Sequence, residues 1–232
     1  ITIAYNESSG GIRTYIDEKR RYLREQTRHD HLLIVPGVED AVERGERSTV
    51  VSLAGPLLPG QDSYRFFARP GRIRAVLLEH RPDIVELGSY YLSPWAAFSY
   101  RQRLRAAGHG CVIGCYFHTD VAEAYVAAPL RGLVHGLFED WSETLSSAGD
   151  RIVALLAGGT ERYVGAVFAA SDIVFAPSPA QAERLRDYGV DASAVVPLGV
   201  DLDLFHPSRR SEAIRARHGA GPDTVALVYA GR

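Results

Sequence analysis

Short apolar runs alternate with longer segments of helical period along most of this chain. Central strands of a parallel sheet are buried on both faces and therefore appear as continuous apolar runs, joined by helices. The sequence thus predicts an α/β fold with a doubly wound, mainly parallel sheet. The expected strands are Ile1–Tyr5, Leu32–Val35, Thr49–Leu53, Asp83–Leu87, Cys111–Phe117, Ile173–Ala176 and Ala194–Val196.

The segments between these runs carry helix signals. Pro179–Tyr188 has the strongest ones, with Ser178 as N-cap, Pro179 in the first turn and Gly189 after its end. Other helices are expected at Ile12–Arg28, Gly71–His80, Pro94–Ala107, Thr160–Ala170 and Arg209–His218, and a mobile helical hairpin at Val121–Ala128 and Leu130–Phe138. A last strand is expected at Thr224–Tyr229.

Composition excludes several classes of protein. With 46% hydrophobic and 23% charged residues, the chain has ordinary globular proportions, and a net charge of -2 exerts no general attraction on nucleic acid. Cys111 and Cys115 lie on one expected strand about 13 Å apart, too far for a disulfide. The two buried thiols and the absence of a signal-like segment favour a cytoplasmic protein. No apolar run approaches about 18 residues, so any membrane contact is expected to be peripheral.

Gly10 and Gly11 stand between the first expected strand and the first expected helix. The first N–H groups of a helix lack intrahelical partners, and the helix dipole favours negative charge there. Backbone without side chains would let a diphosphate approach this helix start. A tight strand-to-helix turn would use the same two residues, so both interpretations stay open. The dinucleotide motif G-x-G-x-x-G is absent at this place.

His118 follows the run Cys111–Phe117, at the carboxyl end of an expected parallel strand. Open α/β sheets bind ligands at that edge. The imidazole could donate a hydrogen bond to a sugar hydroxyl, and Asp120 could orient it. The alternative is a histidine that satisfies backbone groups of its own loop. No second His or Cys lies at ligand spacing nearby, so no metal is expected.

Two further segments carry candidate binding residues. Tyr90 and Tyr91 follow the strand Asp83–Leu87 and could stack on an acceptor, or simply half-bury on the rim. The run Tyr64–Arg74 interleaves arginines, Arg65 among them, with aromatic residues. Such a patch suits an acceptor phosphate or anionic lipid, although arginines that snorkel at a helix entry would look the same. Hydrolase, P-loop and zinc-finger motifs are absent.

The order of these pieces resembles one known family. Six segments follow one another along the chain: Gly10-Gly11, His118, Ala170-Ser171-Asp172, Ala176-Pro177-Ser178, the run Pro197–Pro207 and Gly231-Arg232. In this order they resemble the Rossmann-like N-terminal half of a retaining family-four (group 1) glycosyltransferase with the GT-B fold. The resemblance implies an acceptor-side domain, a nucleotide-sugar donor and a sugar or lipid acceptor, with no metal or other cofactor and no nucleic acid partner.

The resemblance also implies residue roles. Gly10, Gly11 and Arg232 would bind the donor diphosphate. His118 would contact the transferring sugar. From their positions in the sequence, and not from the resemblance, we expect Asp120 to be catalytic together with His118, and Tyr90, Tyr91 and Arg65 to contact the acceptor.

The family's lysine and paired glutamates would lie beyond Arg232. Residues 1–207 are therefore expected to form the acceptor-side domain, and residues 208–232 a linker helix and the first strand of a C-terminal domain that is otherwise missing. The 232 residues alone should have negligible transferase activity, and Val225–Tyr229 should lack its usual burial. Two alternatives stay open: a sugar-nucleotide epimerase of GT-B architecture, and a non-catalytic carbohydrate- or lipid-binding module.

Overall fold

The computed structural model describes residues 1–6, 9–58, 63–118, 120, 130, 143–221 and 223–228, with the backbone alone over 143–150. The chain divides into two compact units, Ile1–Pro197 and Leu198–Arg232. This division lies before the domain boundary that the sequence places after residue 207. The expected hairpin at 121–138 falls almost wholly outside the described residues.

The first unit contains two sheets built around parallel strands. One has the order β1-β3-β2, in which β1 (His31–Gly37) and β3 (Ser48–Ala54) are parallel and β2 (Ala41–Gly45) runs antiparallel to β3. The other has the order β4-β5-β6-β7 and is parallel throughout, with β4 at Ile84–Leu87, β5 at Val112–Tyr116, β6 at Ile173–Ala176 and β7 at Ala194–Val195. The α/β prediction is therefore confirmed, and β2 is an addition to it.

The first three residues bridge the two sheets. Ile1–Tyr5 is not assigned as a strand, yet the N–H of Thr2 donates to the carbonyl of Ile34 in β1 at 3.2 Å. On the other side, the N–H of Gly88 donates to the carbonyl of Ile1 at 2.9 Å, and the nitrogen of Ile1 to the carbonyl of Glu86 at 2.8 Å. These alternating bonds to residues 86 and 88 follow the pattern of parallel neighbours.

Helices follow the strands in the expected alternation. Those near their predicted positions are α1 (Gly11–Gln26), α2 (Pro70–His80), α3 (Ser93–Ala106) and α6 (Pro179–Asp187). The capping prediction for α6 is confirmed, because Ser178 Oγ accepts from the N–H of Gln181 at 3.2 Å and Gly189 has a φ of +76°.

Helix α5 (Glu143–Ala169) corrects the prediction of a short helix at Thr160–Ala170, because it runs straight through Gly149, Gly158 and Gly159. Its stretch Arg151–Ala169 has a mean hydropathy of 1.3 and is long and apolar enough to cross a membrane. From the sequence we expected no apolar run of this length, so this stretch corrects that expectation. Core helices of soluble proteins meet the same criterion. The C-terminal half of α5 does pack in the core, through Val164, Val167 and Phe168.

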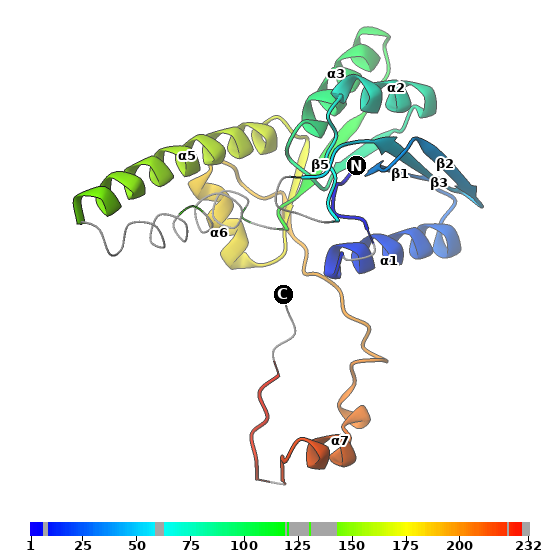
Figure 1. Cartoon of the computed structure of the whole chain (residues 1–232). Helices are drawn as coiled ribbons and strands as arrows, with labels where there is room; N and C mark the ends of the chain where they lie inside the picture. Colours follow the sequence, from blue (N-terminus) through cyan, green and yellow to red (C-terminus); the bar gives the residue numbers. More distant parts are fainter. Residues whose placement is uncertain are drawn as a thin grey trace. The chain divides into compact units, whose positions relative to one another are not determined.

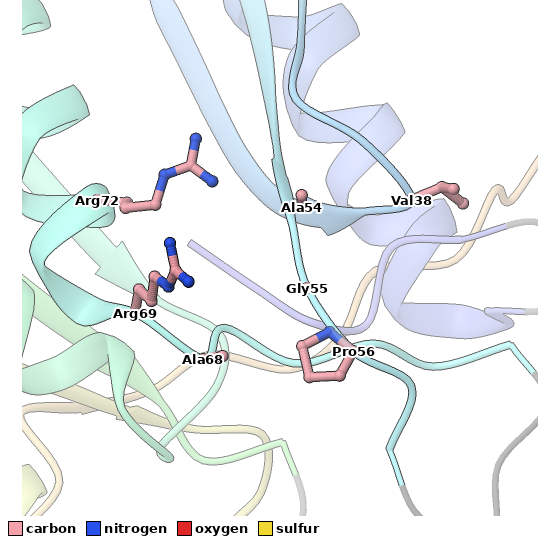
Figure 2. Close-up of a pocket in the computed structure, with 7 residues that line it drawn as sticks. All are labelled: Val38, Ala54, Gly55, Pro56, Ala68, Arg69 and Arg72. Carbon is pink, nitrogen blue, oxygen red and sulfur yellow. The ribbon is translucent and has the colours of Figure 1, made fainter.

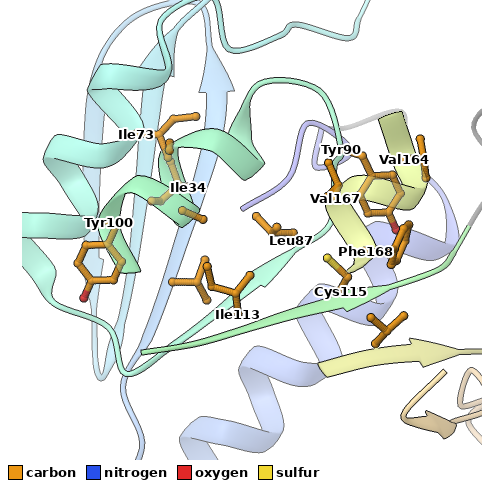
Figure 3. Close-up of a cluster of buried hydrophobic side chains, with 14 of the residues drawn as sticks. Ile34, Ile73, Leu87, Tyr90, Tyr100, Ile113, Cys115, Val164, Val167 and Phe168 are labelled. Atoms are coloured by element: carbon orange, nitrogen blue, oxygen red, sulfur yellow. The ribbon is translucent and has the colours of Figure 1, made fainter. Parts of the chain in front are cut away.

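Strand β1 is covered on both faces, which explains its continuous apolar sequence. Leu33 and Val35 pack with Val50 against Ile16 of α1, whereas Ile34 points into the main core with Ile73 of α2. In Figure 1, α1 lies on one side of this sheet and α2 and α3 on the other. Figure 3 shows the main core, in which residues from α2, α3 and α5 meet Leu87, Ile113 and Cys115 of the four-stranded sheet.

The second unit has little regular structure in its described part. It contains the 3-10 turn Pro207–Arg209 and the short helix α7 (Glu212–Arg217), which Ser211 caps through a bond from the N–H of Ile214 at 3.2 Å. The predicted strand at Thr224–Tyr229 is not formed over its described residues, 224–228. Val225, Leu227 and Val228 are 84%, 93% and 90% exposed, so the expected lack of burial is confirmed for these three.

Candidate functional site

The start of helix α1 carries the glycine pair. Gly10 is the N-cap, and its carbonyl accepts from the N–H groups of Arg13 and Thr14 at 3.1 and 3.3 Å. Within the described part of the chain, no side chain caps this helix start, and a Cβ added at Gly10 or Gly11 would meet nothing within 4 Å. Packing therefore does not require glycine here. The space leaves the N–H groups of Gly11 and Ile12, which have no partner among the described residues, open to an anionic ligand.

The loop that leads into α1 is held by its own polar groups. Ser9 Oγ donates to Asn6 Oδ1 at 2.9 Å and accepts from the N–H of Asn6 at 3.1 Å. Arg13 Nη1 donates to the Asn6 carbonyl at 3.2 Å. These bonds fix the approach to the glycine pair, so the helix start has a defined position before any ligand arrives.

His118 lies two residues after the end of β5 and contacts α1. Its ring stacks on that of Tyr116, with the centroids 4.2 Å apart and the planes at 17°. Tyr15 of α1 meets the same imidazole edge-on, at 5.3 Å and 67°. The helix that begins at Gly11 therefore reaches His118 one turn later. Burial lowers the pKa of His118 to about 4, with Glu86 opposing and Lys19 reinforcing this shift, so the imidazole is neutral at neutral pH.

A half-buried ion pair lies behind Tyr15. Glu86 of β4 pairs with the ammonium of Lys19 on α1 and accepts a hydrogen bond from the Tyr15 hydroxyl at 3.4 Å. Lys19 Nζ also lies 4.2 Å from the centroid of the Tyr15 ring. Burial alone would raise the pKa of Glu86, but the Lys19 ammonium outweighs it and holds that pKa below its usual value. Sequence reasoning assigned these three residues no role at the site, although a lone carboxylate within an apolar strand was a signal.

Asp120 contacts α6 in this structure. Its carboxylate accepts from Arg184 Nε at 2.7 Å and from the Tyr188 hydroxyl. Arg184 also binds Glu161 of α5 at 2.8 Å and Asp187 at 3.2 Å. These bonds tie the chain just after His118 to α5 and α6. A catalytic role for Asp120 stays a prediction.

The two tyrosines after β4 have different environments. Tyr90 lies in the core and not on the rim, because its ring packs 4.9 Å from Phe168 and its hydroxyl donates to the carbonyl of Tyr116. Its ring thus has no free face for stacking on an acceptor here. Tyr91 is 40% exposed, and its carbonyl accepts from the Tyr163 hydroxyl. An acceptor contact remains a prediction for both.

An open pocket of about 360 Å³ lies beyond the carboxyl ends of β1 and β3, and it contains part of the arginine-rich run. Figure 2 shows the guanidinium groups of Arg69 and Arg72 on one side, facing the Ala54–Pro56 segment. Arg72 pairs with Asp40, whereas the Arg69 side chain forms no ion pair or hydrogen bond with other described residues. Arg65 instead donates to the Gly55 carbonyl at 2.7 Å, which makes it a support for the pocket wall.

Arg232 and Thr119 lie outside the described residues, so the structure does not place them. Among the residues that are described, no three His, Cys, Asp or Glu side chains gather into a group that could hold a metal ion.

Comparison with known proteins gives consistent matches. Residues 9–204 match the sequence model of Glycosyltransferase Family 4. The chain is 28% identical, over 98% of its length and 52% of the relative's, to the GDP-mannose-dependent alpha-(1-6)-phosphatidylinositol dimannoside mannosyltransferase of Mycobacterium tuberculosis.

Two further relatives cover less of the chain. The GDP-mannose-dependent alpha-mannosyltransferase of Corynebacterium glutamicum is 29% identical over 81% of this chain and 39% of the relative. The D-inositol 3-phosphate glycosyltransferase of Streptomyces bingchenggensis is 34% identical over 45% and 23%. The chain thus spans about half the length, or less, of the curated relatives it matches.

Proposed function

This chain belongs to glycosyltransferase family 4, and on that premise we propose that it is the acceptor-side half of a retaining transferase that moves a sugar from a nucleotide-sugar to a lipid or saccharide acceptor. One observation carries the proposal: the helix that begins at Gly10 and Gly11 touches His118 through Tyr15, at 5.3 Å between ring centroids. An anion-binding helix start and a neutral imidazole are thereby joined by a single helix.

Each part has a defined task in this proposal. The donor diphosphate lies at the N-terminus of α1, where unpaired N–H groups offset negative charge. His118 donates a hydrogen bond to a hydroxyl of the transferring sugar. As the nucleoside diphosphate departs, its growing charge is stabilised by the helix start and by Arg232. GDP-mannose is the donor to test first, because two of the relatives are named as dependent on it.

The pocket at Arg69 and Arg72 is the proposed site for an anionic group of the acceptor. Support comes from Arg69, whose guanidinium has no partner among the described residues, and from two relatives named for phosphatidylinositol dimannoside and D-inositol 3-phosphate, both of which contain phosphate. A lipid acceptor would place the protein on the cytoplasmic side of a membrane as a peripheral protein. No observation favours the epimerase or the non-catalytic module.

A chimera tests the transfer reaction. The 232 residues are joined to the remaining C-terminal part of the Mycobacterium tuberculosis relative and supplied with GDP-mannose and phosphatidylinositol dimannoside. The chimera should transfer mannose with retained anomeric configuration, the chain alone should not, and His118→Ala should reduce the rate at least about tenfold, the loss of one good hydrogen bond. Transfer by the chain alone, or an unaffected His118→Ala chimera, would contradict the proposal.

The acceptor pocket is tested separately by NMR titration of the chain. Inorganic phosphate should perturb the amide signals of Arg69 and Arg72, and Arg69→Gln should weaken this binding. Vesicles with and without anionic lipid distinguish a headgroup from free phosphate. Arg44→Gln, a change on the exposed strand β2, is the matched control for a general loss of charge. Equal binding by Arg69→Gln and wild type would exclude the pocket.

A further inference from the structure

The imidazole of His118 is oriented in an unusual way for a candidate catalytic histidine. Such residues are commonly oriented by a carboxylate or carbonyl that binds one ring nitrogen. Here the backbone N–H of His118 donates to the Tyr116 carbonyl at 2.9 Å, but within the described part of the chain neither ring nitrogen has a hydrogen-bond partner. Asp120, the nearest candidate in sequence, binds Arg184 and Tyr188.

Ring contacts hold the imidazole instead. Tyr116 covers one face at 4.2 Å with nearly parallel planes, and Tyr15 approaches edge-on at 5.3 Å. The two tyrosine rings are 6.0 Å apart at 53° and so form a corner around the histidine. Stacked and edge-on pairs are both favourable geometries, and together they restrict rotation of the ring about its side-chain bonds.

Both tyrosines are themselves fixed at their hydroxyl ends. Tyr116 donates to the carbonyl of Val196, just after β7. Tyr15 donates to Glu86, and the Lys19 ammonium lies against its ring while pairing with the same carboxylate. Strands β4 and β5, helix α1 and the segment after β7 thus all contribute to the position of one imidazole.

We propose that Tyr15 and Tyr116 are positioning residues that orient His118 through ring contacts, with the Lys19–Glu86 pair holding Tyr15 in place, so that no described residue occupies either ring nitrogen and both can face the substrate. The substrate, not the protein, then selects the tautomer: a sugar hydroxyl can receive a hydrogen bond from one nitrogen while the other meets solvent or a second group. The substrate part rests on the proposed function, whereas the orientation part stands independently of it.

The electrostatics agree with this arrangement. The charged and titratable groups that act on the imidazole are Glu86 from β4 and Lys19 from α1, with the Tyr15 and Tyr116 hydroxyls beside them. Burial is the largest influence and keeps the imidazole neutral, with a pKa of about 4. A neutral ring has one donor and one acceptor nitrogen, as a tautomer chosen by the substrate requires.

NMR of the His118 ring protons in the 232-residue chain tests the orientation without donor or acceptor. In the wild type, these protons should lie upfield of those of exposed His109, because the Tyr116 face shields them. The titration midpoint should lie near 4. Ring protons at the positions of an exposed histidine would overturn the proposal before any variant is made.

Substitutions then separate the ring from the hydroxyl. Tyr15→Phe keeps the ring edge and its contact with Lys19 and loses only the bond to Glu86, so it should change the His118 signals and midpoint less than Tyr15→Leu does. Tyr15→Leu removes the ring and should raise the midpoint by at least about one pH unit toward 6.5, the value of an exposed histidine. Tyr22→Leu is the matched control, because Tyr22 lies on the same helix and is 61% exposed.

The outcomes are distinguishable from a failure of the transfer reaction. A Tyr15→Leu protein with wild-type His118 signals contradicts the orientation role, whatever the chimera does. If the Tyr15 variants change the His118 signals as expected but the chimera transfers no sugar, the positioning role is retained and the proposed function is rejected. If Tyr15→Leu does not fold, Lys19→Gln removes the support of Tyr15 without removing its ring, and should broaden or shift the His118 signals. Unchanged signals would contradict the role of the pair.

Discussion

Acidification should destabilise the folded chain through His118, and the effect can be calculated. The pKa of this imidazole is about 4 in the folded protein and 6.5 in an unfolded one. Between these values the unfolded state binds a proton that the folded state does not, so stability falls as the pH falls through this window. At ~1.36 kcal/mol for each pH unit the full difference is about 3 kcal/mol, and partial solvent screening of the half-buried ring reduces this to about 2 kcal/mol.

Urea unfolding at pH 7 and pH 4.5 measures this contribution. Wild type should lose about 2 kcal/mol more stability between the two pH values than His118→Gln, which cannot take up the proton. His31, whose pKa burial also lowers to about 4, is present in both proteins, so its effect cancels in the comparison. His109→Gln, at an exposed position, should follow wild type. Equal pH dependence of wild type and His118→Gln would refute the claim that burial keeps the imidazole neutral.

Two helix contacts give further predictions. Gly165→Ala should destabilise the protein by about 1–3 kcal/mol in thermal unfolding, because the added Cβ would lie 2.6 Å from the Tyr188 carbonyl oxygen. Gly158→Ala is the control on the same helix: its Cβ meets open space, so it should stabilise the protein by up to about 1 kcal/mol. A stabilised Gly165→Ala would show that α5 and α6 can separate at no cost. Asp120→Ala should remove the main partner of Arg184 on α6, and so lower the free energy of unfolding by about 1 kcal/mol and accelerate amide exchange in α6. Exchange at the wild-type rate would contradict the role of Asp120 in holding α6.

Much of the fold was predictable because the strands are buried on both faces. Ile173–Ala176 was predicted at its observed bounds, and α6 was located by its cap residues, whose chemistry is local. Strand β2 was missed because all five of its residues are exposed and carry no apolar pattern. It pairs with β3 through a turn in which Arg47 has a φ of +53°. The long helix α5 was missed because glycines were taken as interruptions.

The candidate site was predictable only in part. The position of His118 at a strand end followed from the sequence, since a parallel strand presents its carboxyl end to the ligand edge. The grouping of Tyr15, Lys19 and Glu86 did not, because partners 67 to 71 residues apart meet only when α1 packs beside β4. Tyr90 was placed on the rim because loop residues tend to be exposed, whereas its aromatic ring gains more by joining Phe168 in the core.

The seam formed by the first three residues has a kinetic consequence. Their neighbours on the two sides, Ile34 and the Glu86–Gly88 stretch, follow much later in the chain. Contacts of such large sequence separation form slowly, since a long loop must close before any bond rewards it. The two sheets can thus assemble separately and become one layer only when the segment Ile1–Ile3 pairs with both of them.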